Sequence, residues 1–153
     1  MNLRIRLSGV ALIEVMIAVL ILAIGVVGAI GLQAKSLSAL SNAGARVDAT
    51  IAAEKVIGLM STDQANLATY VWDGTGTAPT ALGNWWLEVN GDASTTPPTP
   101  GLLPNATVVI TVTAIAGSTA SLVSVTLTWQ RRTGANGDPL SAHTIVATLG
   151  PAQ

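Results

Sequence analysis

The chain has 153 residues, of which 50% are hydrophobic and 10% are charged, and its formal net charge is -1. This balance argues against a nucleic-acid-binding surface, which needs clustered basic residues. Because the chain has no cysteine, disulfides, zinc–thiolate clusters and thiol nucleophiles are excluded. His143 is the single histidine, which leaves little basis for a metal cluster or a catalytic triad. We therefore expect a non-enzymatic protein without a metal or another cofactor.

The N-terminal segment is a short basic leader, residues 1–9, followed by a long apolar run. Arg4 and Arg6 lie in the leader, and the 18 residues from Val15 to Leu32 carry no charge. As a helix, residues 10–32 would span about 34 Å, enough to cross a hydrocarbon core of about 30 Å. The two arginines before the run predict a single membrane pass with a cytoplasmic N-terminus.

One acid, Glu14, lies near the start of this apolar run. Buried at the centre of a membrane helix, a carboxylate costs about 2.5 to 3.5 kcal/mol, which the Val, Ile and Leu residues of the run can offset. A removable signal peptide predicts a shorter apolar region that ends in an A-x-A-like site, and this run has neither property. A plain membrane anchor explains the length of the run but not its acid, because an intramembrane carboxylate needs a partner.

Gly9 followed by VALIEVMIAVLILAIG resembles the N-terminus of type IV pilins, usually written as Gly and then F-T-L-I-E. The resemblance implies that a prepilin peptidase cleaves between Gly9 and Val10 and methylates the new N-terminus. It also implies that Glu14 is the glutamate at mature position five, although Val10 and Ala11 replace the usual Phe and Thr. In lipid, Glu14 would pair with the N-terminal amine of a neighbouring subunit and set the axial register between subunits.

Three glycines, Gly25, Gly28 and Gly31, give the second half of the apolar run a surface of small residues. One interpretation is the ordinary enrichment of glycine in membrane helices. Another is close helix–helix packing, since Gly25 and Ala29 form a small-xxx-small pair. Because each glycine also costs about 1 kcal/mol of helix stability outside a membrane, local melting of the helix in an assembled filament is a further interpretation. The residues favour none of these interpretations over the others.

The segment 33–61 is Ala-rich and has no proline, which predicts that the helix continues as an amphipathic half. We expect its apolar stripe to pack on the chain's own sheet, with other helices covering the first half of the stripe. After Ile51 the stripe moves to another face, so either the last turns are buried on both sides or the helix bends near Glu54. The helix is expected to end within residues 61–63. The stripe is formed by Leu37, Leu40, Gly44, Val47 and Ile51.

The run GVVGAIGLQAKSLSALSNAGARVDATIAAEKVIGLMSTD resembles the PilV-type minor pilins, in which I-G-x-x-G-x-x-G-L-Q precedes an Ala-rich helix. These low-abundance subunits are called type IV pilus modification proteins. The resemblance implies a structural subunit that takes part in pilus assembly and priming and, in some members, in cell adhesion. It also implies an inner-membrane location before assembly and a location in the pilus at the cell surface afterwards. The implied partners are other pilin subunits, prepilin peptidase and the inner membrane, with no nucleic acid.

Two alternatives remain open at the level of the sequence. A minor pseudopilin of a type II secretion system shares the same N-terminal features. A membrane-anchored binding domain that does not polymerise also explains a single apolar helix followed by a small domain.

Residues 62–153 are predicted to form a small antiparallel β globular part with loops, so the chain is expected to be α+β with a type IV pilin-like fold. Alternation of apolar and polar residues predicts strands at Thr107–Ile115, Leu122–Arg131 and His143–Leu149. The sequence AGST is predicted to join the first two of these strands as a tight hairpin.

A short fourth strand is predicted at Trp85–Asn90. In a strand, the adjacent Trp85 and Trp86 would face opposite ways. One of them would then pack in the core, and the other would be exposed as a possible interface residue.

Overall fold

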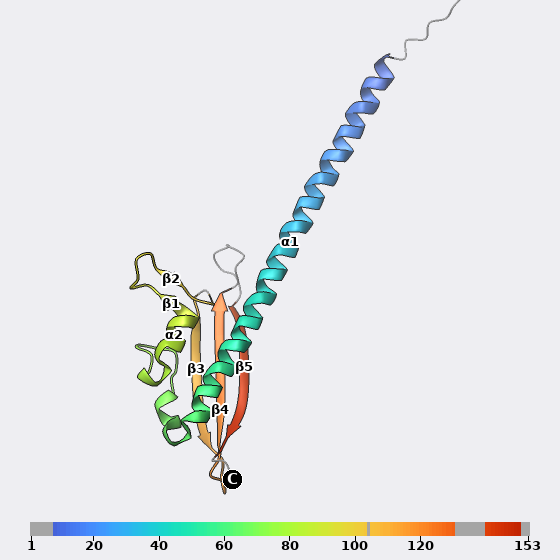
Figure 1. Ribbon diagram of the computed structural model, residues 1–153. Coiled ribbons are helices and arrows are strands. Elements are labelled where there is room, and N and C mark those ends of the chain that lie inside the picture. The colour runs from blue at the N-terminus through green and yellow to red at the C-terminus, as the bar shows by residue number, and fades with distance from the viewer. Residues whose placement is uncertain (1–7, 104, 131–139, 151–153) are drawn as a thin grey trace, which may run out of the picture. The chain divides into compact units, whose positions relative to one another are not determined.

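The computed structural model describes residues 8–103, 105–130 and 140–150. A long apolar helix, α1 (Ser8–Thr62), precedes a small antiparallel sheet, which confirms the predicted α+β class (Figure 1). The chain divides into two compact units, Met1–Leu40 and Ser41–Gln153. The first unit contributes only helix to the described residues, and the second contains every other element.

The C-terminal end of α1 lies where the sequence predicts it. No proline occurs before residue 79, so nothing in the covalent chain interrupts the helix. In the last turn, the hydroxyl of Ser61 donates to the carbonyl of Gly58 (2.7 Å) and that of Thr62 donates to the carbonyl of Leu59 (2.8 Å). Asp63 then leaves helical geometry, with φ -125° and ψ 48°.

Three antiparallel strands form the main sheet in the order β3 (Thr107–Ala114), β4 (Ser121–Gln130) and β5 (Leu140–Leu149). The AGST hairpin is confirmed, because the N–H of Ile115 donates to the carbonyl of Ala120 (3.1 Å) directly before and after it. The first two strands lie within one residue of their predicted starts. Strand β5 begins three residues earlier than predicted, and the predicted strand end at Arg131 lies outside the described residues.

The predicted strand at Trp85–Asn90 is wrong, because these residues belong to the helix α2 (Gly83–Asn90). Its apolar residues alternate, as in a strand, but Leu82, Trp85 and Val89 also recur at spacings of three and four and form its buried side. Gly91 ends the helix with φ +87°, a conformation that favours glycine. The helical spacing, rather than the alternation, therefore describes how this segment packs.

Short elements surround α2 in the second unit. Two 3₁₀ helices, η1 (Gln64–Tyr70) and η2 (Thr80–Leu82), precede it along the chain. A small antiparallel ladder follows, with β1 (Gly91–Asp92) paired to β2 (Thr99–Pro100). The segment after η1 pairs with β3 between Trp72 and Ile110, whereas α2 lies next to α1, where Trp85 donates to the carbonyl of Ala52.

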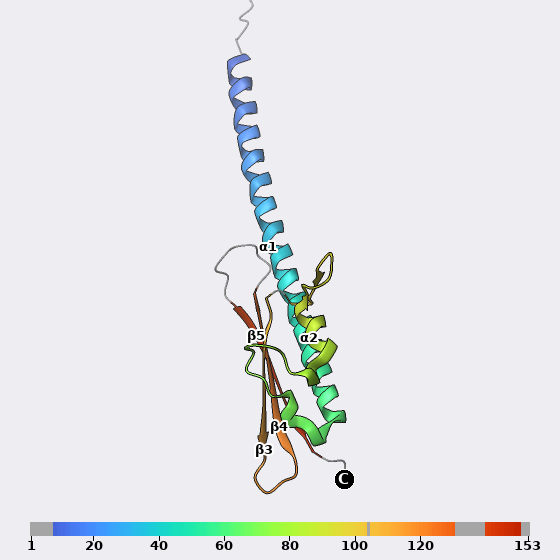
Figure 2. The same ribbon diagram turned by 90° about the vertical axis from the view of Figure 1, so that its left-hand side faces the viewer.

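The part of α1 that belongs to the second unit lies against one face of the main sheet (Figure 2). Its buried face is not the predicted apolar stripe: Val47 and Ile51 are 58% and 54% exposed. The small side chains of alanine let the helix backbone approach the sheet closely, and the sheet supplies the bulk of the core. The buried residues of α1 are Ala45, Ala49, Ala52, Ala53, Val56 and Met60.

This buried face, formed by Ala45, Ala49, Ala52, Ala53, Val56 and Met60, is called here the alanine face. It shows that neither alternative predicted for the last turns of α1, burial on both sides or a bend near Glu54, is needed. Val56 and Met60 continue the buried face that begins at Ala45, so the helix needs neither a bend nor burial on both sides.

On the sheet, the predicted alternation of β4 is confirmed. Its inward side chains and those of β3 are fully buried against the alanine face: Val108, Ile110, Val123, Val125, Leu127 and Trp129.

Candidate assembly surface

In the described residues of the first unit, the apolar helix has no covered face. Every large apolar side chain between Leu12 and Leu32 is at least 50% exposed. Among the described residues, one helix is long and apolar enough to cross a membrane, with a mean hydropathy of 2.9 over its most apolar 18 residues. By length and composition, the chain can therefore be anchored in a membrane through α1.

Glu14 lies exposed within this apolar part of α1. Among the described residues, no hydrogen bond or ion pair joins Glu14 to another side chain, and the next charged residue along the helix is Lys35. The predicted processing residues, Gly9 and Val10, lie in the first turn of the same helix. The structure therefore places the acid near the start of an apolar surface, without a partner of its own among the described residues.

The glycines 25, 28 and 31 leave open space on the surface of α1. A Cβ atom built at any of them would meet no heavy atom within 4 Å outside the local helix backbone. The helix continues through all three positions. Their predicted role in helix packing or melting stays a prediction, and the open space means that a neighbouring backbone can approach there.

In the second unit, α1 carries a surface that faces away from the sheet, formed by Gly44, Val47 and Ile51 and called here the outer stripe. Both apolar side chains of the outer stripe are more than half exposed, whereas Ala45 and Ala49 on the other side of the helix are buried. In the first unit, Leu37 and Leu40 are also exposed, at 68% and 70%. Within the described residues, the apolar side chains of the stripe found in the sequence are therefore left exposed.

The tryptophans predicted as interface candidates lie in α2 and pack inward. Trp85 is 3% exposed, and its indole Nε1 donates to the carbonyl of Ala52 (2.9 Å). Trp86 is partly buried, and its ring meets the ring of Trp72 edge-on with centroids 4.9 Å apart. Trp85 therefore offers no interface, and Trp86 offers only part of its ring.

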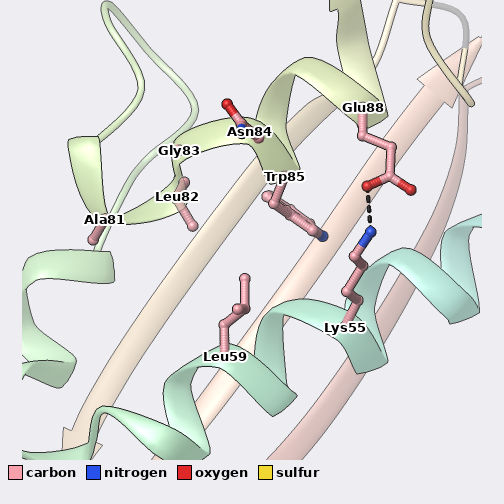
Figure 3. Close-up of a pocket in the computed structure, with 8 residues that line it drawn as sticks. All are labelled: Lys55, Leu59, Ala81, Leu82, Gly83, Asn84, Trp85 and Glu88. Atoms are coloured by element: carbon pink, nitrogen blue, oxygen red, sulfur yellow. Dashed lines mark hydrogen bonds and ion pairs between the residues drawn. The ribbon is translucent and has the colours of Figure 1, made fainter.

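A shallow hollow lies between α1 and α2, lined by Lys55, Leu59, Trp85, Glu88 and residues 81–84 (Figure 3). Lys55 and Glu88 point toward each other across it and form an ion pair. Both side chains are about half exposed, so this pair contributes little to stability. None of the lining residues forms a nucleophile–base pair, and the hollow gives no chemical reason to assign a reaction to it.

Asp92 lies at the end of β1, where the hairpin that joins β1 to β2 begins. Its carboxylate accepts hydrogen bonds from the hydroxyl (2.5 Å) and the backbone N–H (2.8 Å) of Ser94. These bonds lower the pKa of Asp92, with the hydroxyl bond as the larger cause. Because the pKa is lower in the folded state, the contribution of the carboxylate is present above its ordinary value of about 3.9 and is lost as the pH falls through the lowered pKa.

We therefore expect the N–H resonance of Ser94 to titrate below about pH 3.9 as the hairpin loosens. The measurement is a pH series of amide chemical shifts for the full chain in detergent micelles. In Asp92→Asn, which keeps an acceptor oxygen but does not ionise, this titration should disappear. A titration of the Ser94 amide at or above the ordinary pKa of aspartate would contradict the assignment.

Within the parts of the chain that the structure describes, no group of three or more His, Cys, Asp or Glu residues lies in a metal-binding arrangement. The candidate site of the first unit is therefore the apolar part of α1 with Glu14, and the candidate site of the second unit is the outer stripe. Comparisons of the chain with protein-family models, with curated proteins and with solved structures found no match.

Proposed function

We propose that this chain is a non-enzymatic structural subunit of a type IV pilus, a minor pilin of the PilV type. The observation that carries the proposal is the position of Glu14: five residues after Gly9, at the start of an apolar helix whose large apolar side chains from Leu12 to Leu32 are all at least 50% exposed. A membrane anchor needs the apolar residues alone. A helix that passes from a membrane into a filament also needs an interaction that fixes its axial register relative to the neighbouring helices.

The charge of Glu14 would provide this interaction. In the membrane or in a filament core, an ionised carboxylate without a partner carries a large desolvation cost. Cleavage between Gly9 and Val10 would create a new N-terminal amine on every subunit. That amine is a positive charge at a depth in the membrane or filament core similar to that of Glu14. Pairing Glu14 of one subunit with the amine of the next offsets the cost only at one axial register, so the pair selects that register.

The outer stripe supports the same proposal in the second unit. Val47 and Ile51 face away from the sheet, and the alanine face of α1 already satisfies the core. Exposed apolar side chains at helical spacing are typical of a helix that packs against another helix. In a filament, the α1 helices of neighbouring subunits would cover the outer stripe, and the sheet would remain on the outside.

The first test concerns processing. We expect mass spectrometry of the chain from its native membrane to find an N-terminus at Val10 that carries one methyl group. Gly9→Val should block cleavage, because a bulky side chain replaces the glycine at the cleavage site, and the uncleaved chain should stay in the membrane. Ser8→Ala, which changes the neighbouring leader residue, should leave cleavage unchanged.

The second test is the location of the processed chain after filaments are sheared from cells. A pilus subunit should appear in the sheared fraction together with other pilins. If the chain is found only in the membrane, with residues 1–9 intact, a membrane-anchored domain that does not polymerise replaces the proposal. If a cleaved chain follows the components of a type II secretion system, the proposal is replaced by a minor pseudopilin.

A further inference from the structure

We draw no further inference here: the strongest candidate, the uncharged, threonine-rich face of the main sheet that points away from α1, carries none because nothing in the structure shows what covers it.

Discussion

Replacing Glu14 with alanine should remove the chain from sheared filaments while its insertion into the membrane continues. Membrane insertion should become easier, since an acid within an apolar helix opposes insertion. Incorporation should fall by at least about tenfold, because the neighbouring N-terminal amine would be left without its counter-charge in an apolar environment. The measurement is the amount of the chain in the sheared fraction relative to the amount in the membrane.

Glu54→Ala is the matched control for this prediction. Glu54 is also an exposed acid on α1, but it lies in the second unit, away from the apolar run. This variant should be incorporated at the level of the unaltered chain. Glu14→Gln separates charge from hydrogen bonding and should behave like Glu14→Ala. Normal incorporation of both Glu14 variants would exclude the register role of this residue.

The second large effect is expected on stability, at the alanine face of α1. Ala49 has no exposed surface and lies on the helix face that packs against the sheet. Ala49→Leu would force a larger side chain into a filled core, which should lower the free energy of unfolding by about 1 to 3 kcal/mol. Thermal unfolding of the full chain in detergent, followed by tryptophan fluorescence, measures this change, because Trp85 and Trp129 lie in the same core.

Ala43→Leu is the control for the alanine face. Ala43 is exposed on the same helix and in the same unit, so a larger side chain there has room. Its effect on the free energy of unfolding should stay within about 0.5 kcal/mol. A large loss for Ala43→Leu together with no loss for Ala49→Leu would mean that the helix packs through its other face.

The strands of the main sheet could be predicted from the sequence because inward and outward side chains alternate along each of them. Alternation in β4 places Val123, Val125, Leu127 and Trp129 on one face, and the structure buries all four. The AGST hairpin was readable for a similar reason, since a short turn between two alternating runs leaves little freedom of register. The helix α2 could not be predicted in this way, because the six residues WWLEVN satisfy the strand pattern as well as the helical one.

The apolar stripe on α1 shows a different limit. Periodicity reveals that Val47 and Ile51 share one face of a helix, but it does not say what covers that face. The sheet selected the face of Ala45 and Ala49 instead, since close approach of the helix backbone allows larger side chains of the sheet to fill the core. On the other face, Val47 and Ile51 remain more than half exposed within the described residues.

Local sequence was sufficient for properties that depend on order along the chain: an apolar stretch of membrane length, Glu14 at its start, the end of α1 and three alternating strands. These properties follow from short-range sterics and from the free energy of transfer of each side chain. Properties that depend on which surfaces meet required the tertiary structure. The alanine core and the inward packing of Trp85 result from competition among surfaces for burial and for hydrogen bonds, and that competition involves residues far apart in the sequence.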